Sequence, residues 1–489
     1  MPQPNERTSI KVQSERAVLA AVRLPDAVYD QRDPFGELKS LAQQAGAIIV
    51  GELEQRKQKP EPATFIGSGK LDELKGLCEL LGASLVIFDH DLSPRQIANI
   101  EEVVGRKVID RSELILDIFA SRATTHEAKL QVEMAQMEYT YPRLRAMWDH
   151  LERIVGAGGI AGIGTRGPGE QQLEIDRRLV QRKKLDLKRE LDDIHARKRR
   201  MVRERKLDHF TVGIVGYTNA GKSTLFNTLT GLGWGLGGAY ADDRLFATLV
   251  TRTRDWDLGG GLRVMLSDTV GFVRDLPHHL VASFRATLEE AIHADLLLIV
   301  LDASDPAADL QFDAVTQTLD DLLAEAESYE RQSQQWGVAR SADGPQHGLS
   351  PTRVLLLNKV DRLKDNREIL AWQRRADSSS TGSPSGPADS AHLAACIPIS
   401  AIDPAHPGHE QLRDFVRSAA QGGVLDVTLR LALKDAKAIN IVENRALVLA
   451  REYDDGFVRL RVRIGRRQLD QLRSTTGRAV QVLDHTPGA

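Results

Sequence analysis

The sequence predicts an α/β protein in four parts, and three patterns of apolar residues carry that prediction. Short apolar runs alternate with helical stretches over residues 17–123 and again from residue 209, an order typical of mainly parallel sheets covered by helices. Between these blocks, apolar residues recur every seven positions over 171–206, which indicates a long helix. FVRLRVRI (457–464) alternates strictly, which predicts a half-buried strand. We expect an N-terminal parallel α/β domain (1–124), an antiparallel helical hairpin (125–208), a central doubly wound α/β domain (209–422) and a small C-terminal α+β domain (423–489).

The composition is that of an ordinary globular chain and excludes several classes of protein. The 489 residues suffice for about three domains, and a formal net charge of -3 gives no global indication of a nucleic-acid or membrane partner. Two cysteines, Cys78 and Cys396, favour a reducing compartment over a disulfide framework or a zinc site. The polar N-terminal stretch lacks the apolar core of a signal peptide, and apolar runs such as 296–301 are far shorter than the ~20 residues of a membrane span. We expect a cytoplasmic protein without a membrane span.

The N-terminal domain is predicted from alternating strands and helices. Ser93 followed by Pro94 is a helix start, because serine caps the N-terminus and proline suits the first helical position. The predicted elements are strands at 17–22, 47–50 and 85–89 and helices at 37–45, 70–81 and 94–104.

Two long helical segments follow, joined by GAGGIAGIGTRGPGEQQ (156–172). The first, 125–155, carries Leu144, Trp148, Leu151 and Val155 on one face, and the second, 171–206, carries Leu173, Val180, Leu187, Ile194 and Met201 seven residues apart. The second seam needed by a long coiled coil is poor, since only Leu191 is well placed. An antiparallel hairpin within a monomer therefore fits better than a dimeric coiled coil.

The second helix of the hairpin is strongly basic. Between Arg177 and Lys206 there are 14 Lys+Arg and 5 Asp+Glu, an excess of 14 - 5 = 9 positive charges. Two interpretations stay open: a solvated helix face, or a surface that contacts a phosphate backbone.

The central domain repeats the strand–helix order. Strands are predicted at 211–216, 262–268, 296–302, 353–358 and 396–400, with loop-like stretches at 329–351 and 377–390, the latter of linker composition.

A phosphate-binding loop is predicted in TVGIVGYTNAGKSTLF (211–226), where the spacing G-x-x-x-x-G-K-S lies between an apolar strand and a helix. Glycines let backbone N–H groups approach phosphates, and the helix N-terminus adds its dipole. Lys222 is expected to reach the β- and γ-phosphates and Ser223 to bind magnesium. A chance glycine-rich turn is the alternative, which the strand and helix on either side disfavour. The expected nucleotide contacts here are Gly216, Tyr217, Thr218, Asn219, Ala220, Gly221, Lys222, Ser223 and Thr224.

Two further motifs follow in order, each at the end of an apolar strand. In Asp268-Thr269-Val270-Gly271, the aspartate suits the magnesium shell and the glycine N–H can sense the γ-phosphate. In Asn358-Lys359-Val360-Asp361, the last carboxylate can accept hydrogen bonds from guanine N1–H and N2–H2. Adenine offers no such donor pair, and sites of this kind can discriminate by ~10⁴-fold or more. The three motifs together favour GTP over ATP.

Two shorter signals complete the expected site. Ser400-Ala401, with Ile402 after it, resembles a fifth, guanine-contacting motif. LFATLVTRTRD (245–255) offers Thr248, Thr251 and Thr253 as candidates for a switch threonine, and the residues alone leave that choice open.

At this point the sequence resembles the HflX family of translation-factor-related GTPases over nearly its whole length. The resemblance rests on FIGSGKLDEL (65–74), VIFDHDLSPRQIANIEE (86–102), KLQVEMAQMEYTYPRL (129–144), GIGTRGPGEQQLEIDRR (162–178), GYTNAGKSTLFN (216–227), LFATL (245–249) and DTVGFVRDLPHHLVASFRATLEE (268–290).

The resemblance implies a cytoplasmic GTPase that binds GTP/GDP, the large ribosomal subunit and ribosomal RNA, and that dissociates stalled or stressed ribosomes. It selects Thr248 as the switch threonine, with Phe246 and Ala247 beside the nucleotide. The expected Mg2+ ligands are then Ser223, Thr248 and Asp268, and the expected catalytic residues are Lys222, Thr248, Gly271 and Asn219. It also implies that the N-terminal domain and hairpin contact ribosomal RNA.

The residue after Gly271 is Phe272, where many P-loop GTPases have a glutamine that orients the attacking water. Unassisted turnover is therefore expected near ~10⁻⁴ s⁻¹, the rate of unassisted Ras-type hydrolysis. Either the ribosome compensates by ordering the switches, or K+ held partly by Asn219 does, as in related GTPases with an asparagine at that position. The plain alternative for Asn219 is a hydrogen bond that stabilises the loop.

Several other features are given structural interpretations. Gly67-Ser68-Gly69-Lys70 lacks Walker spacing and is taken as a turn before a helix, with a second nucleotide site as a minor alternative. His278-His279 lack a third ligand and are taken as surface residues. Residues 156–169 form either a flexible connector or an RNA-probing tip. Two other functions are alternatives to ribosome splitting. One is a GTP-gated RNA-binding or assembly factor, and the other is a tRNA-modification GTPase, which no motif in the sequence supports.

Overall fold

The computed structural model forms two compact units, the first made mainly of residues 1–194 and the second mainly of the rest, and each is described by itself. The structure describes residues 15–25, 29–157, 168–208, 210–231, 251–259, 262–274, 293–335, 351–380, 393–422, 424–454, 456–465, 469, 472 and 480–487.

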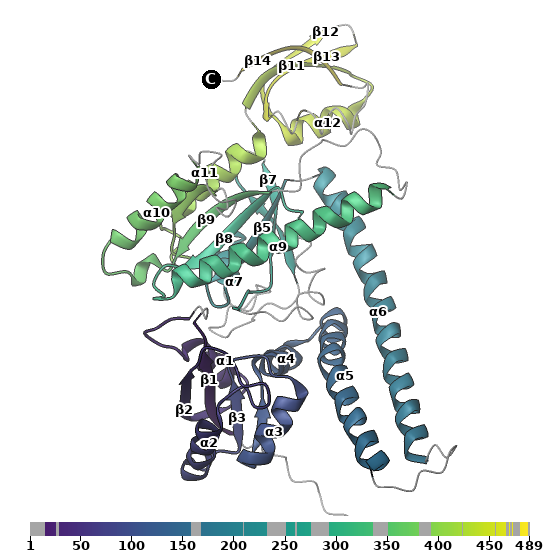
Figure 1. Ribbon diagram of the computed structural model, residues 1–489. Coiled ribbons are helices and arrows are strands. Elements are labelled where there is room, and N and C mark those ends of the chain that lie inside the picture. The colour runs from purple at the N-terminus through teal and green to yellow at the C-terminus, as the bar shows by residue number, and fades with distance from the viewer. Residues whose placement is uncertain are drawn as a thin grey trace, which may run out of the picture. The chain divides into compact units, whose positions relative to one another are not determined.

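The first unit begins with a four-stranded parallel sheet in the order β2-β1-β3-β4 (Figure 1). The inner strand β1 (Arg16–Arg23) is buried on both faces, which explains the continuous apolar run at 17–22. The elements are β1 (Arg16–Arg23), α1 (Gly36–Gln44), β2 (Ile48–Arg56), α2 (Ser68–Leu81), β3 (Leu85–Phe88), α3 (Pro94–Val104), β4 (Lys107–Ile109) and α4 (Arg111–Arg122). The parallel α/β prediction is confirmed.

The helix start at Ser93 is also as predicted. The Ser93 side chain accepts a hydrogen bond from the Gln96 N–H, and the Gln96 side chain accepts one from the Ser93 N–H. Pro94 is the first residue of α3. Strand β4 and helix α4 were not predicted. A strand of three residues is too short to show a period, and seven residues of α4 are buried, which hides its amphipathic pattern.

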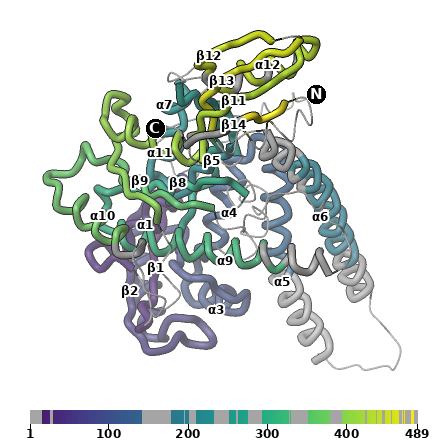
Figure 2. The backbone as a smooth tube through the Cα atoms, turned by 90° about the horizontal axis from the view of Figure 1, so that it is seen from above, coloured from purple at the N-terminus to yellow at the C-terminus, as the bar shows by residue number. Residues whose placement is uncertain are grey.

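Helices α5 (His126–Ala157) and α6 (Pro168–Asp208) form the predicted antiparallel hairpin and run side by side in both views (Figures 1 and 2). Their core joins Leu130 and Met134 of α5 to Leu187 and Leu191 of α6. The pairs Lys183–Glu133 (2.6 Å) and Lys184–Glu138 (3.2 Å) follow the same register. Part of the positive charge of α6 is therefore neutralised by acidic residues of α5. The side chains of the predicted face at 144–155 lie outside the described residues.

The second unit contains a six-stranded sheet in the order β10-β9-β8-β5-β7-β6. All neighbouring strands are parallel except β6 and β7, which form an antiparallel hairpin. Helices α7 and α11 pack on one face through residues such as Phe226 and Leu412, and β8 is buried along its whole length, as a doubly wound sheet requires. The elements are β5 (Thr211–Gly216), α7 (Lys222–Leu229), β6 (Arg252–Asp257), β7 (Arg263–Asp268), β8 (Leu296–Asp302), α9 (Ala308–Gln335), β9 (Thr352–Asn358), η1 (Val360–Arg362), α10 (Arg367–Ser380), β10 (Leu393–Pro398) and α11 (Gly408–Gln421).

Three features of this sheet differ from the prediction. Strand β6 was missed because only Trp256 of its six residues is buried. The loop expected at 329–351 is helical up to Gln335, and the linker expected at 377–390 is helical up to Ser380. Both helices are anchored by buried residues earlier in their sequence, for example Phe312 against Trp372 with ring centroids 5.3 Å apart, and an anchored helix continues through polar residues.

A four-stranded antiparallel sheet in the order β12-β13-β11-β14 ends the chain. Val458, Leu460, Val462 and Ile464 are buried on one face of β13, which confirms the alternation seen in FVRLRVRI. Helix α12 packs Ala438 and Val442 on that face. The elements are β11 (Val424–Ala432), α12 (Ala436–Arg445), β12 (Leu447–Asp454), β13 (Phe457–Gly465) and β14 (Val480–Pro487). Within the described ranges, no helix is both long and apolar enough to cross a bilayer.

Candidate functional site

The predicted motifs meet at one edge of the six-stranded sheet. The loop after β5, the loop after β7, the turn after β9 and the segment after β10 all leave the carboxyl ends of parallel strands. The strand order changes direction beside β5, and ligands of open α/β sheets bind at such a point. Motifs that are 182 residues apart in the sequence (400 - 218) are therefore brought to one site by the topology.

The loop after β5 has the conformation that a phosphate cradle needs. Gly216, Asn219 and Gly221 have φ of 151°, 60° and 94°. A Cβ on Gly216 would lie 2.2 Å from the Val300 carbonyl oxygen, and one on Gly221 would lie 2.2 Å from Asn358 Nδ2, so glycine is required at both positions. Helix α7 follows with Gly221 as its N-cap and no side chain capping it. Its first N–H groups are thus available to an anion.

Lys222 lies buried at the base of this loop. Its Nζ donates a hydrogen bond to the Tyr217 carbonyl oxygen at 2.7 Å. Burial lowers the pKa of Lys222 to about 8, although the nearby Asp268 carboxylate acts in the opposite direction. A bound phosphate would supply the negative charge that keeps this ammonium protonated.

Ser223 and Asp268 form a pair of oxygen donors beside the loop. The Ser223 hydroxyl donates to Asp268 Oδ2 at 2.8 Å, and Asp268 is fully buried. Hard oxygen donors of this type suit Mg2+, which usually keeps several waters and takes further ligands from phosphates. The described part of the chain has no cluster of three or more His, Cys, Asp or Glu that could enclose a metal by itself. The pair therefore fits a magnesium ion shared with a nucleotide.

Asn358 connects the phosphate loop to the segment after β10. Its Nδ2 donates to the Ala220 carbonyl oxygen at 2.7 Å, and its Oδ1 accepts from the Ala401 N–H at 2.9 Å. The residue is 1% exposed, so both bonds lie in a dry environment. Asn358 therefore acts as a structural link, which the motif alone did not reveal.

The Asp361 carboxylate is exposed and accepts a hydrogen bond from a buried serine. The Ser400 hydroxyl donates to Asp361 Oδ1 at 2.6 Å, and Ser400 is 1% exposed. Lys359 has a φ of 61° and its Nζ pairs with Asp302 Oδ2 at 2.6 Å. Ile402 is 62% exposed beside this segment. The arrangement leaves an open carboxylate with an apolar neighbour, which is what a guanine base requires.

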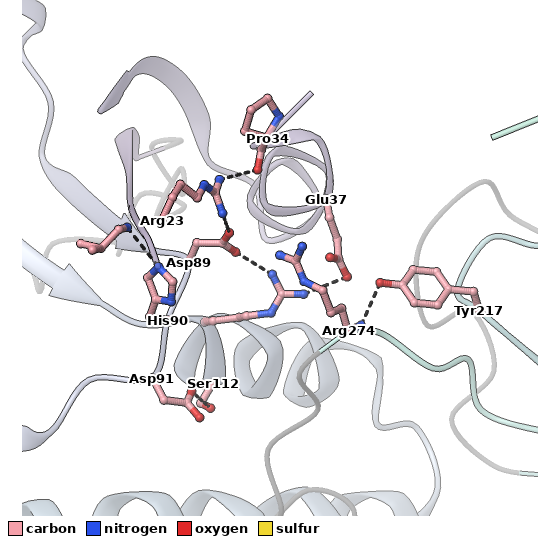
Figure 3. Close-up of polar contacts among 11 residues, drawn as sticks. Arg23, Pro34, Glu37, Asp89, His90, Asp91, Ser112, Tyr217 and Arg274 are labelled. Carbon is pink, nitrogen blue, oxygen red and sulfur yellow. Dashed lines mark hydrogen bonds and ion pairs between the residues drawn. The ribbon is translucent and has the colours of Figure 1, made fainter. Parts of the chain in front are cut away.

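The supporting roles of three residues were not predicted from the sequence. Asp302 ends the buried strand β8, and a polar residue after such a strand was an available signal. His409 binds the Ser400 carbonyl oxygen through Nε2 at 3.0 Å, and burial lowers the pKa of His409. The Tyr217 hydroxyl accepts a hydrogen bond from the Arg274 N–H at 2.8 Å (Figure 3). The last two contacts depend on the tertiary structure, and no sequence signal could have found them.

The segment after β7 lies against the phosphate loop. The Phe272 N–H donates to the Gly216 carbonyl oxygen at 3.1 Å, and the Phe272 carbonyl oxygen accepts from the Thr218 N–H at 2.8 Å. The Phe272 side chain is 2% exposed. The Thr269 hydroxyl donates to the Ile214 carbonyl oxygen at 2.8 Å, which fixes the start of the motif on β5.

Some predicted site residues lie outside the described residues or stand apart from the others. Phe246, Ala247, Thr248, His278 and His279 fall outside the described ranges. Asn219 is exposed, and among the described residues its side chain makes no hydrogen bond, so the loop-stabilising alternative finds no support there. The expectation that Asn219 binds K+ stays a prediction.

The first unit holds a separate buried ion network at the carboxyl ends of β1 and β3 (Figure 3). Asp89 pairs with Arg23 at 3.0 Å and with Arg111 at 2.7 Å, and Arg111 also pairs with Glu37 at 2.8 Å. The charges balance within the network, which indicates a structural role. Gly67 is the N-cap of α2, and Lys70 pairs with Glu73 at 2.7 Å, so Ser68, Gly69 and Lys70 form the first turn of the helix rather than the expected turn before it.

Comparison with known families covers most of the chain. Residues 32–120 match the family model "GTP-binding GTPase N-terminal", residues 122–205 match "GTP-binding GTPase Middle Region", and residues 211–336 match "50S ribosome-binding GTPase".

Individual relatives carry the name GTPase HflX. The protein from Escherichia coli (strain K12) is 38% identical over 430 residues, 88% of this chain and 89% of its own. The protein from Lacrimispora saccharolytica is 44% identical over 318 residues, 65% of this chain and 73% of its own. Among solved structures, a GTP-binding protein from Sulfolobus solfataricus in complex with GDP is 25% identical, covers 83% of this chain and 98% of its own, and has a TM-score of 0.39.

Proposed function

The chain belongs to the HflX family of GTPases, and from that premise we propose that it binds the large ribosomal subunit and dissociates stalled or stressed ribosomes. GTP hydrolysis is the activity of the family, and a phosphate loop, a carboxylate–serine pair and a guanine-type carboxylate meet at one sheet edge. That meeting of three motifs is the observation that carries the enzymatic part of the proposal. The family model described as a 50S ribosome-binding GTPase supports the choice of partner.

In this proposal the phosphates bind the N–H groups at the start of α7, and Lys222 leaves the Tyr217 carbonyl oxygen to contact the β- and γ-phosphates. Ser223 and Asp268, with Thr248 from the switch segment, hold Mg2+. When bound, Mg2+ neutralises charge on the phosphate oxygens. The Gly271 N–H contacts the γ-phosphate and so distinguishes GTP from GDP.

The guanine base binds at Asp361. Its carboxylate accepts the N1–H and N2–H2 hydrogen bonds, while Ser400 and the link through Asn358 hold the two sides of the base pocket together. ATP lacks the matching donors, so it is expected to bind far more weakly.

Ribosomal RNA is assigned to the N-terminal domain and the helical hairpin. Arg178, Lys188 and Arg200 are exposed on α6, and such residues can contact phosphates. We assign GTP turnover to residues 209–422, RNA contact to the N-terminal domain (1–124) with the hairpin (125–208), and a separate module to 423–489. The protein acts as a cytoplasmic monomer in this scheme.

A GTP-gated RNA-binding or assembly factor without splitting activity is the second candidate. The exposed basic side chains of α6 favour it equally, because RNA binding needs no subunit separation.

The test is GTP turnover by the purified full chain in potassium buffer, with and without large ribosomal subunits and with ATP as the control. We expect strong stimulation that is specific to GTP, followed by separation of intact ribosomes on sucrose gradients. GTP-dependent binding without separation would favour the second candidate. Turnover without any stimulation would contradict the ribosomal partner and leave the GTPase assignment intact. Replacing potassium by sodium in the same assay tests the role of Asn219, since equal rates would exclude it.

A further inference from the structure

The described active-site segments leave one role in GTP hydrolysis unfilled. Phe272 stands where many P-loop GTPases have the glutamine that orients the attacking water. Its side chain is buried, and a phenyl ring neither donates nor accepts a conventional hydrogen bond. A polar group that faces the γ-phosphate must therefore come from another position.

Thr218 is placed next to that position. Its N–H donates to the Phe272 carbonyl oxygen at 2.8 Å, which fixes the residue against the segment after β7. A Cβ on Gly271 would lie 2.7 Å from Thr218 Cγ2 and 2.9 Å from Lys222 Nζ. The methyl carbon of Thr218 and the lysine ammonium thus border the same small space beside Gly271, and a rotation about χ1 of Thr218 would bring its hydroxyl to the same side. The Gly271 N–H and Lys222 are the groups assigned above to the γ-phosphate.

Thr218 is only 6% exposed, yet its buried hydroxyl has no hydrogen-bond partner among the residues that the structure describes. Other threonines around the site are satisfied: Thr228 donates to the Ala401 carbonyl oxygen at 2.7 Å, and Thr230 to the Phe226 carbonyl oxygen at 2.7 Å. A buried hydroxyl without a partner costs about 1–3 kcal/mol. Valine would fill the same volume without that cost, so a hydroxyl at this place needs a functional reason.

We propose that Thr218 Oγ1 is a catalytic hydroxyl that donates a hydrogen bond to a γ-phosphate oxygen and accepts one from the attacking water. A hydroxyl has one donor and two acceptor sites, so it can make both bonds at once. The inference rests on the phosphate-site assignment given under the proposed function.

In the reaction, the water oxygen forms a bond to the γ-phosphorus while the bond from that phosphorus to the β–γ bridging oxygen breaks. The electron pair of the broken bond stays on GDP, and both protons of the attacking water leave with the released phosphate as H2PO4⁻. Thr218 keeps its own proton and stabilises the charge on the equatorial oxygens.

The test uses two substitutions that separate the hydroxyl from the methyl group of Thr218. Thr218→Val keeps the shape and removes the hydroxyl, whereas Thr218→Ser keeps the hydroxyl and removes the methyl. Thr230→Val is the control, since it removes the hydroxyl of the residue that ends α7, at the opposite end of the helix from the phosphate site. Single-turnover hydrolysis of GTP is measured with Mg2+ in potassium buffer, together with the Kd of GDP and of GDP–AlF4⁻.

We expect Thr218→Val to hydrolyse GTP about 10²-fold more slowly, the size of effect seen when one donor to a transition-state oxygen is removed. Its Kd for GDP should stay within about twofold of wild type, while its affinity for GDP–AlF4⁻ falls. Thr218→Ser should keep a rate within about threefold of wild type, and Thr230→Val should behave as wild type.

A wild-type rate in Thr218→Val, with Thr218→Ser slowed, would overturn the proposal and assign Thr218 a packing role through its methyl group. If Thr218→Val loses GDP binding, the comparison of Thr218→Ser with Thr218→Ala decides: a slow alanine variant beside an active serine variant supports the hydroxyl, and equal rates refute it. Absence of GTP turnover in the wild-type chain would instead contradict the GTPase assignment on which the inference rests.

Discussion

Removing the Ser400 hydroxyl is expected to weaken guanine recognition selectively. The hydroxyl donates to Asp361 Oδ1 at 2.6 Å, and this contact fixes the orientation of the exposed carboxylate that is proposed to bind the base. In Ser400→Ala the Ala401 N–H keeps its bond to Asn358, because that bond uses the backbone. The substitution therefore frees the carboxylate without opening the rest of the pocket.

The magnitude follows from the strength of a charge-assisted hydrogen bond. Hydrogen bonds to charged groups contribute about 1.5–3 kcal/mol, and the exposure of Asp361 places this one at the lower end. A loss of about 1–2 kcal/mol corresponds to a roughly 5- to 30-fold higher Kd for GDP.

The assay is calorimetric titration with GDP and with IDP, whose base lacks the exocyclic amino group. Wild type should prefer GDP, because both base donors meet Asp361, and Ser400→Ala should reduce that preference. Ser328→Ala on the exposed side of α9 is the control. An unchanged preference, or an equal loss for both nucleotides together with a lower Tm, would refute the argument and make Ser400 a purely structural residue.

Other substitutions and conditions test the remaining parts of the structure. The pKa of Lys222 is lowered to about 8, and a bound nucleotide should raise it, so GDP binding at pH 8.5 should take up about 0.7–0.8 of a proton, against almost none at pH 6.5. Calorimetric titrations in buffers of different ionisation enthalpy measure this proton uptake. Equal uptake at the two pH values would contradict the lowered pKa. The free energy of unfolding should increase as pH rises from about 8 toward 10.5, because in that range Lys222 is protonated in the unfolded chain and deprotonated in the folded one. Gly271→Ala places a Cβ 2.7 Å from Thr218 Cγ2, so GTP turnover should fall at least 10-fold while GDP binding persists, and retained turnover would show that the loop can shift. Arg111→Met leaves Asp89 with one fewer partner in a buried network and should cost about 3–5 kcal/mol of stability in urea denaturation, whereas a loss under 1 kcal/mol would mean that water enters the network.

The order of elements could be predicted wherever burial leaves a periodic trace. Strand β8, buried along its length, and β13, buried on alternate residues, were both evident. Strand β6, with only Trp256 buried, left no such trace, and the helical ends of α9 and α10 depend on anchoring contacts that lie elsewhere in the chain. Sequence patterns report burial, so elements that bury little are invisible to them.

The sequence by itself determined the chemistry of this protein, because each motif carries its function within a few neighbouring residues. The strand, loop and helix around Lys222 specify a phosphate site, and the carboxylate of Asp361 specifies guanine. The tertiary structure alone decided how these motifs depend on one another. It joined Asn358 to Ala220, Ser400 to Asp361, and Thr218 to Phe272 across the edge of the sheet. Such contacts arise because parallel strands far apart in sequence end at the same edge, and only the strand order determines which loops become neighbours.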